Sequence, residues 1–271
     1  MTIDSIDYSE SNPPVRQPVT ASVAALVIKA VSKRFKNHQA LSDVSLRCEC
    51  GESIAVIGLN GAGKTTLLRA TLGFVGVDQG RIQLFGVDAE RPASRQRVAF
   101  LPERLLLTPE LSGWQSIELL LGVRKLQADR ADCEQKLSSM GFPLDQLDAP
   151  AKTYSKGMSQ KIGLVAAINS SARLLVLDEP FTGLDPRARR SLVQALLQWR
   201  DAGRSLVFTA HSLVDLDRLS DQVAIMHEGR LIFCDSPEIL RKQYLDPELG
   251  TGSLEQAFLH CIEQSDEAEF A

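Results

Sequence analysis

The spacing of apolar residues changes along the 271-residue chain. From residue 24 to residue 100, short runs rich in Val, Ile and Leu are punctuated by Gly and Asp, a pattern that predicts strands. Between residues 105 and 167, apolar residues recur three and four positions apart, which is typical of amphipathic helices. From residue 172 to residue 233, strand-like and helix-like runs alternate. The pattern predicts an α/β protein with a helical insertion at about residues 104–167.

The alternating region predicts how the sheet is built. Strands joined by helical crossovers of roughly 10 to 20 residues imply a parallel sheet that is covered by helices on both faces. We expect one folded domain over residues 23–235, preceded by a disordered tail, residues 1–22, whose sequence is acidic and polar. A short extension, residues 236–271, follows the domain, and we expect its acidic end to be frayed.

A phosphate-binding pattern follows the apolar run SIAVI. Residues 58–66 read GLNGAGKTT, which matches the P-loop pattern G-x-x-x-x-G-K-[ST]. In such a loop, backbone N–H groups surround phosphate oxygens at a helix N-terminus. The lysine reaches the β- and γ-phosphates, and the hydroxyl residue binds Mg²⁺. The candidate contacts are Gly58, Asn60, Gly61, Ala62, Gly63, Lys64, Thr65 and Thr66.

Two carboxylates follow a second apolar run, LLVL at residues 174–177. Asp178 at the end of a strand could hold Mg²⁺, and Glu179 could orient and deprotonate the water that attacks the γ-phosphorus. A buried strand that meets an acidic turn would give the same letters. The P-loop about 110 residues upstream favours the catalytic interpretation.

The segment AKTYSKGMSQKIGLVAAI places Ser155 and Gly157 at the start of a predicted helix, which is a second anion-binding arrangement. The order of motifs is now specific: a P-loop, a Ser-Gly helix start, an Asp-Glu strand end, GLD at 183–185, and a histidine after the next strand. Over residues 24–235 this order resembles the ATP-binding subunit of ABC transporters.

The resemblance implies a fold and roles for further residues. The fold would be a RecA-like P-loop NTPase core with an antiparallel β subdomain and an inserted α-helical subdomain. YSKGM at 154–158 corresponds to the family signature LSGGQ, and it departs at three of five positions but keeps the serine and the second glycine. In the family, each ATP lies between the P-loop of one subunit and the signature of the other. Asp185 corresponds to the D-loop, His211 to the switch histidine at the γ-phosphate, and Phe35 to the aromatic residue that stacks on adenine. Structural roles for His211 and Phe35 are the alternatives.

A second segment, LSGWQ at 111–115, is closer to LSGGQ by eye. The signature should begin a helix shortly before the Asp-Glu strand. Ser155 lies 23 residues before Asp178, whereas Ser112 lies 66 residues before it. We therefore expect Ser112 to cap the first helix of the insertion.

One departure from the family concerns metal binding. The family usually has a glutamine where the chain leads into the helical insertion, and here AFLPER puts Glu103 at that position. A carboxylate could also bind Mg²⁺, but it would add negative charge beside the phosphates; alternatively, Glu103 points away. The change resembles a branch of bacterial ABC exporters with LPE and SKGM-type motifs, and it favours export.

Composition narrows the function classes. The net charge of −4 argues against a nucleic-acid partner, because such proteins normally carry a basic surplus. Cys48 and Cys50 alternate along a predicted strand, the other three cysteines are dispersed, and neither the five cysteines nor the four histidines show metal-ligand spacing. No apolar stretch reaches the 18 or so residues of a membrane span, and the start lacks the pattern of a signal peptide. We expect a cytoplasmic protein, peripheral on the inner face of the cell membrane.

We conclude that the chain is an ATPase that uses ATP and Mg²⁺, forms a homodimer around two ATP molecules, and energises a separate integral membrane permease, with export favoured over import. Leu105, Leu106, Leu107 and Trp114 are candidate permease contacts, although packing within the insertion would also explain them. A soluble ABC-type ATPase of translation or DNA repair is a second hypothesis. A P-loop kinase or GTPase is a third, but no guanine-reading motif N-K-x-D is present.

Overall fold

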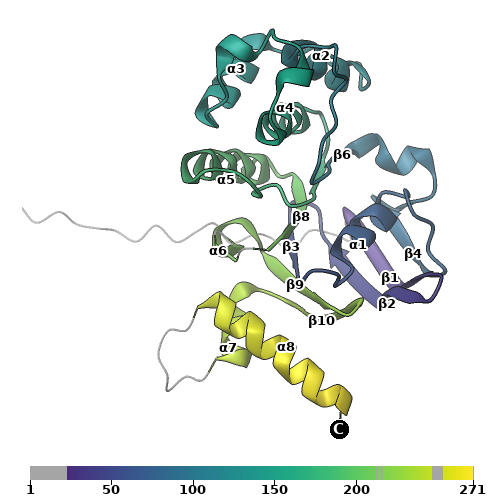
Figure 1. Ribbon diagram of the computed structural model, residues 1–271. Coiled ribbons are helices and arrows are strands. Elements are labelled where there is room, and N and C mark those ends of the chain that lie inside the picture. Colours follow the sequence, from purple (N-terminus) through teal and green to yellow (C-terminus); the bar gives the residue numbers. More distant parts are fainter. Residues whose placement is uncertain (1–22, 212, 215, 246–252, 271) are drawn as a thin grey trace, which may run out of the picture.

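The computed structural model describes residues 23–211, 213–214, 216–245 and 253–270. The predicted tail, residues 1–22, lies outside the described residues. Two sheets meet in the lower part of the molecule, and a group of helices stands above one end of the larger sheet (Figure 1). The α/β class and the helical insertion that the apolar pattern predicts are therefore both present.

The smaller sheet is antiparallel, with strand order β2-β1-β4-β5. Strand β1 (Leu26–Phe35) pairs with β2 (His38–Cys48), to which a tight turn joins it, and on its other side with β4 (Gln79–Leu84). Strand β4 in turn pairs with the short antiparallel strand β5 (Val87–Asp88). One face is buried and the other is partly exposed, which is usual for antiparallel sheets.

The larger sheet has strand order β10-β9-β3-β8-β7-β6. Five strands are parallel: β3 (Ser53–Ile57), β6 (Val98–Leu101), β7 (Leu174–Leu177), β8 (Ser205–Ala210) and β9 (Gln222–His227). The edge strand β10 (Arg230–Asp235) is antiparallel to β9. The predicted parallel sheet is thus mixed, because a tight hairpin joins its last two strands.

Alternate residues of the parallel strands enter two different cores. Ile54 and Val56 of β3 pack with helix α1 (Lys64–Thr71) and the antiparallel sheet. Ala55 and Ile57 face the opposite way, toward α5 (Pro186–Asp201) and the helical insertion. Because both faces are covered, these strands are continuous apolar runs rather than alternating ones.

The insertion comprises α2 (Gly113–Gly122), α3 (Arg130–Ser139) and α4 (Lys156–Ile168), with short 3-10 turns between α3 and α4. Ser112 caps α2, as expected: its Oγ accepts from the Gln115 N–H, and the Gln115 side chain accepts from the Ser112 N–H. This reciprocal capping box satisfies two backbone donors that the helix itself leaves unpaired.

The C-terminal extension differs from the expectation. The short helix α6 (Leu216–Leu219) precedes β9 and lies before the extension. Within the extension the chain forms α7 (Pro237–Tyr244) and α8 (Leu254–Phe270), so the expected frayed end is wrong. Helix α8 buries apolar residues and packs on α7 and β10, and Asp266 Oδ1 lies 2.7 Å from His227 Nε2 at the end of β9. Figure 1 shows α8 lying beside the hairpin of β9 and β10. No helix in the described ranges is both long and apolar enough to cross a bilayer.

The capping box generates a stability prediction. Ser112→Ala should lower the free energy of unfolding by about 1 kcal/mol, because an N–H at the start of α2 loses its acceptor. Ser112→Thr keeps the acceptor and is the matched control. Urea unfolding followed by circular dichroism measures both variants, and an Ala variant as stable as the wild type would contradict the capping assignment.

Candidate nucleotide-binding site

The predicted site residues lie where four neighbouring strands end. The register pairs Ile57 of β3 with Ala210 of β8, and Leu177 of β7 with both Phe208 and Leu101. The next residues along each strand therefore emerge at one edge of the sheet. Parallel α/β sheets bind ligands at this carboxyl edge.

The P-loop connects β3 to α1, and two of its glycines are sterically required. A Cβ at Gly58 would lie 2.2 Å from the Met226 carbonyl oxygen, and one at Gly63 would lie 2.5 Å from the Ala40 carbonyl oxygen. Gly63 has a φ of 100° and is the N-cap of α1. Because any side chain would clash with the backbone, these positions admit only glycine.

Lys64 is 7% exposed at the first position of α1. Its Nζ donates to the carbonyl oxygens of Gly58, at 2.8 Å, and of Leu59, at 3.1 Å. Burial lowers the pKa of this amine, while the nearby carboxylates of Glu179 and Asp178 oppose that shift. The ammonium group is therefore held at the loop by groups that a phosphate could replace as acceptors.

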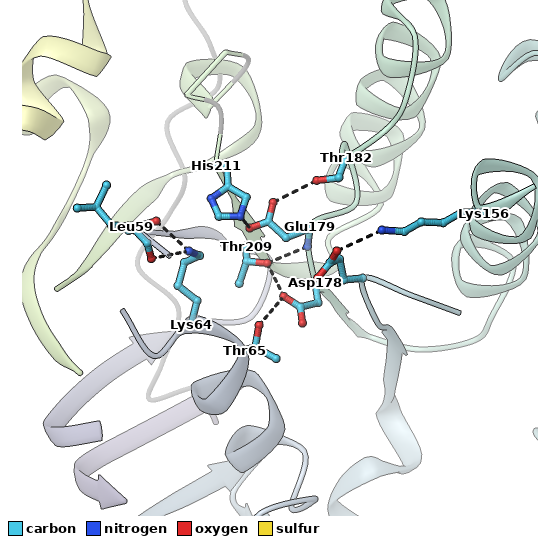
Figure 2. Close-up of polar contacts among 11 residues, drawn as sticks. Leu59, Lys64, Thr65, Lys156, Asp178, Glu179, Thr182, Thr209 and His211 are labelled. Atoms are coloured by element: carbon cyan, nitrogen blue, oxygen red, sulfur yellow. Dashed lines mark hydrogen bonds and ion pairs between the residues drawn. The ribbon is translucent and has the colours of Figure 1, made fainter. Parts of the chain in front are cut away.

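Figure 2 shows a buried polar network behind the P-loop. The Thr209 hydroxyl donates to Asp178 Oδ1 at 2.7 Å and accepts from the backbone N–H of Glu179 at 2.8 Å. Thr65 Oγ1 lies 3.4 Å from the same Asp178 oxygen. One hydroxyl of β8 thus orients both acidic residues after β7, and Asp178 links them to the P-loop.

Glu179 is strained and largely buried. Its φ is 51°, a left-handed conformation that is uncommon for a residue other than glycine and that clusters at functional sites. Burial raises the pKa of its carboxyl group, against the opposing effects of His211 and Lys64. Oε1 lies 3.1 Å from His211 Nε2 and accepts no hydrogen bond among the described residues, while Thr182 donates to Oε2 at 3.4 Å.

A cavity of about 330 Å³ lies in front of this network. From the predicted set it is lined by Phe35, Lys64, Glu103, Glu179, His211 and the loop residues from Asn60 to Thr66. Phe35 is 44% exposed at the end of β1, so its ring is available for stacking. The cavity joins a phosphate-binding loop to an exposed aromatic face, which is the arrangement that a nucleotide requires.

The oxygen atoms of Asp178 and Thr65 are ligands of the kind that Mg²⁺ prefers. Asp178 is 4% exposed, and its Oδ1 accepts hydrogen bonds from the hydroxyl groups of Thr209 and Thr65. Within the described ranges, no three or more His, Cys, Asp or Glu residues form a cluster that could hold a metal. Mg²⁺ commonly uses one or two carboxylates, water and phosphate oxygens rather than an all-protein cage. Thr65 and Asp178 would hold the ion.

The signature residues lie outside this cavity. Ser155 is the N-cap of α4, where its Oγ accepts from the Met158 N–H, and Gly157 follows in the first turn. Asp185 is the N-cap of α5, and the hydrogen bonds it accepts from the N–H groups of Ala188 and Arg187 lower its pKa. None of the three lines the cavity at the chain's own P-loop.

The motifs did not reveal three neighbours of the site. Thr209 organises the acidic pair, and His38 and Ala40 line the cavity beside Phe35. Threonine is common in strands, so a Thr in SLVFTA carries no functional signal by itself. Its position one residue before the end of a parallel strand was the available clue.

Comparison with known proteins decides the family. A family model described as ABC transporter matches residues 41–182, more than half of the chain. The chain belongs to the ABC transporter family. The solved structure of an ATP-binding subunit of an ABC transporter superposes with a TM-score of 0.78 and 29% identity, covering 88% of this chain and 99% of that one. The predicted ABC-type fold class is thereby confirmed.

Curated members of the ABC family are similar over most of this chain. A daunorubicin resistance ATP-binding protein of Streptomyces coeruleorubidus is 34% identical over 213 residues, which are 77% of this chain and 67% of that protein. An Fe(3+) ions import ATP-binding protein of Haemophilus influenzae is 31% identical over 223 residues, covering 79% and 63%. An uncharacterized ABC transporter ATP-binding protein of a Nostoc species is 34% identical over 207 residues, covering 75% and 62%. The chain thus spans roughly two thirds of the length of these relatives.

The buried network generates a prediction about Thr209. Thr209→Val should destabilise the fold by about 1–3 kcal/mol and weaken MgATP binding, because a buried N–H and carboxylate lose their shared partner. Thr209→Ser keeps the hydroxyl group and should behave nearly as the wild type. Thermal unfolding and nucleotide titration measure the two effects, and a Val variant that matches the Ser variant in both would contradict the role of the hydroxyl.

Proposed function

We propose that this chain is the ATP-hydrolysing subunit of an ABC transporter. It dimerises around two molecules of ATP and drives a separate integral membrane permease, to which it binds at the inner face of the cell membrane. The observation that carries the proposal is the convergence of Lys64, Thr65, Glu179 and His211 at one cavity, with Asp178 Oδ1 3.4 Å from Thr65 Oγ1. Family membership supports the same activity.

Each residue of the cavity has a defined task in hydrolysis. Lys64 and the N–H groups of the P-loop would bind the β- and γ-phosphates, and Phe35 would stack on the adenine. Bound at Thr65 and Asp178, Mg²⁺ would neutralise phosphate charge. These contacts position the γ-phosphorus and withdraw charge from it, which is the main source of catalysis in phosphoryl transfer.

Glu179 is the candidate general base. Glu179 lines the cavity, and its Oε1 is buried and accepts no hydrogen bond among the described residues. We propose that this carboxylate takes the proton of the attacking water. A carboxylate with a raised pKa is a better base than an ordinary one. His211, 3.1 Å from Oε1, would orient this group and contact the γ-phosphate. Glu103 lines the rim, where two roles are open: it is a third ligand for Mg²⁺, or it is held away from the metal and the phosphates.

A second copy of the chain would complete each site. Ser155 and Gly157 lie at a helix N-terminus and do not line the chain's own cavity, and a Cβ at Gly157 would meet only Ser155 Oγ, at 3.9 Å. This open approach suits a phosphate held by another subunit. Because one chain carries both halves of the site, we propose a homodimer with two equivalent sites, with Asp185 at the same interface.

Export is the favoured direction. The LPE and SKGM motifs and the likeness to a resistance protein support export, whereas the likeness to an iron importer supports the opposite direction. The hydrolytic site is common to both. Recovery of a solute-binding protein together with the permease would favour import.

An apolar groove of about 240 Å³ supports docking of a permease. It lies between β6, the C-terminal end of α2 and one face of α4, and Leu105 lines it. The next residue after Leu105, Leu106, is 79% exposed. Val123, which also lines the groove, is 78% exposed. The proposed occupant is an apolar cytoplasmic helix of the permease. Leu107 and Trp114 pack against the core of the insertion instead, which fits the structural alternative for these two residues.

If Glu179 is the general base, replacing it should lower ATPase activity but raise the stability of the fold. Glu179→Gln should retain MgATP but lose hydrolysis at least 100-fold, while Lys64→Ala should lose nucleotide binding. Because the pKa of Glu179 is raised in the fold, its ionisation costs stability as the pH rises through that pKa. The Gln variant should therefore unfold at a higher temperature than the wild type at neutral pH. That gain should shrink as the pH falls and the glutamic acid protonates.

Steady-state phosphate release and thermal unfolding across pH measure these effects. Full turnover by Glu179→Gln would remove the general-base assignment. Unchanged nucleotide affinity in Lys64→Ala would contradict the P-loop assignment.

The groove generates a separate prediction about the partner. Leu106→Glu should reduce capture of a multi-helix membrane protein from detergent-solubilised membranes at least tenfold, because the charge must be desolvated on docking. Leu259→Glu changes an equally apolar, exposed residue of α8, 51% exposed, and is the control. Equal capture by both variants would exclude the groove, and recovery of ribosomes or DNA instead would favour a soluble ATPase.

A further inference from the structure

Two departures from the family pattern contact each other. Glu103 stands where the family usually has glutamine, and Lys156 lies inside the signature segment between Ser155 and Gly157. They are 53 residues apart in sequence, yet Lys156 Nζ donates to Glu103 Oε1 at 3.2 Å. In Figure 2, the Lys156 side chain extends toward the region of Asp178 and Glu179.

Each member of the pair carries a charge that is unfavourable where it stands. Lys156 is the first residue of α4, at the positive end of the helix dipole, where a cation is disfavoured. Glu103 lines the nucleotide cavity, where its carboxylate would repel phosphate oxygens, and it is one of the groups that raise the pKa of Glu179. The ion pair offsets both penalties.

Packing between the two segments fixes the geometry of the pair. Gln160 of α4 donates to the Pro102 carbonyl oxygen at 3.2 Å, one residue before Glu103. One turn further along α4, a Cβ at Gly163 would lie 2.4 Å from Leu105 Cδ2 and 2.6 Å from Leu101 Cδ1. The segment after β6 therefore packs directly on α4. The Lys156–Glu103 ion pair lies at the solvent-exposed edge of this packing contact.

We propose that Lys156 is a positioning residue of the nucleotide site: its ammonium group neutralises Glu103 and holds that carboxylate at the rim, away from the phosphates. This inference rests on the proposed function, because it matters only when MgATP fills the cavity. The two side chains are 53% and 52% exposed, and such pairs contribute little to stability in water. Their coupling should therefore appear in nucleotide affinity rather than in folding.

A double-mutant cycle on the full chain tests the proposal. Lys156→Gln should raise KM for MgATP about three- to fivefold at low salt, the size of effect measured for exposed pairs, with kcat changed less than twofold. The double variant, with both Lys156→Gln and Glu103→Gln, should have the KM of the Glu103→Gln single variant, because no unpaired carboxylate remains. Lys156→Arg keeps the charge and should keep the wild-type KM. The defect of Lys156→Gln should shrink in high salt.

Other results would overturn the inference. A wild-type KM in Lys156→Gln would show that the carboxylate needs no compensation. A defect that persists after Glu103→Gln would show that Lys156 acts on the nucleotide itself, across the dimer interface. If the wild-type chain does not hydrolyse MgATP, the proposed function is overturned as well. If the wild type is active but Glu103→Gln does not restore the KM of Lys156→Gln, only the role of the ion pair is overturned.

Discussion

The site depends on the parallel pairing of β3, β8 and β7, which brings three distant parts of the chain to one edge. The P-loop, the acidic pair and His211 are separated by more than 100 residues in sequence at the extremes, yet each directly follows one of these strands. Because hydrogen-bonded strands lie less than about 5 Å apart, their next residues must be neighbours. The Thr209 hydroxyl then converts this proximity into a defined orientation of Asp178 and Glu179.

The same edge concentrates features that oppose stability. The buried ammonium group of Lys64 lies near Glu179, which combines a raised pKa with a left-handed backbone, and the apolar cores on both faces of the sheet compensate for these costs. Such costs persist where the surrounding structure leaves no alternative conformation.

Much of this arrangement could be predicted from sequence, because it is carried by local patterns. Glycines with a lysine after a strand have few other physical meanings, and the presence of that P-loop is what favours a catalytic interpretation of Asp-Glu after an apolar run. Ser112 was separable from Ser155 by spacing alone. In contrast, Thr209 resembles an ordinary strand residue, and the contact of Lys156 with Glu103 exists only in three dimensions. The acidic end of α8 suggested fraying, but the buried Leu254, Ala257 and Cys261 and the contact of Asp266 with His227 hold this helix.

The central claim is that one chain holds two halves of a site that only a second chain completes. The most direct test is the mass in solution of the Glu179→Gln variant with and without MgATP, beside the same variant carrying Gly157→Glu. A glutamate there has room within the chain and suits a helix N-terminus, but it would face phosphates across the interface. The account predicts a shift from 29.7 kDa to about twice that value with MgATP, and no shift with Gly157→Glu. A monomer at saturating MgATP, or a dimer that tolerates Gly157→Glu, would contradict it.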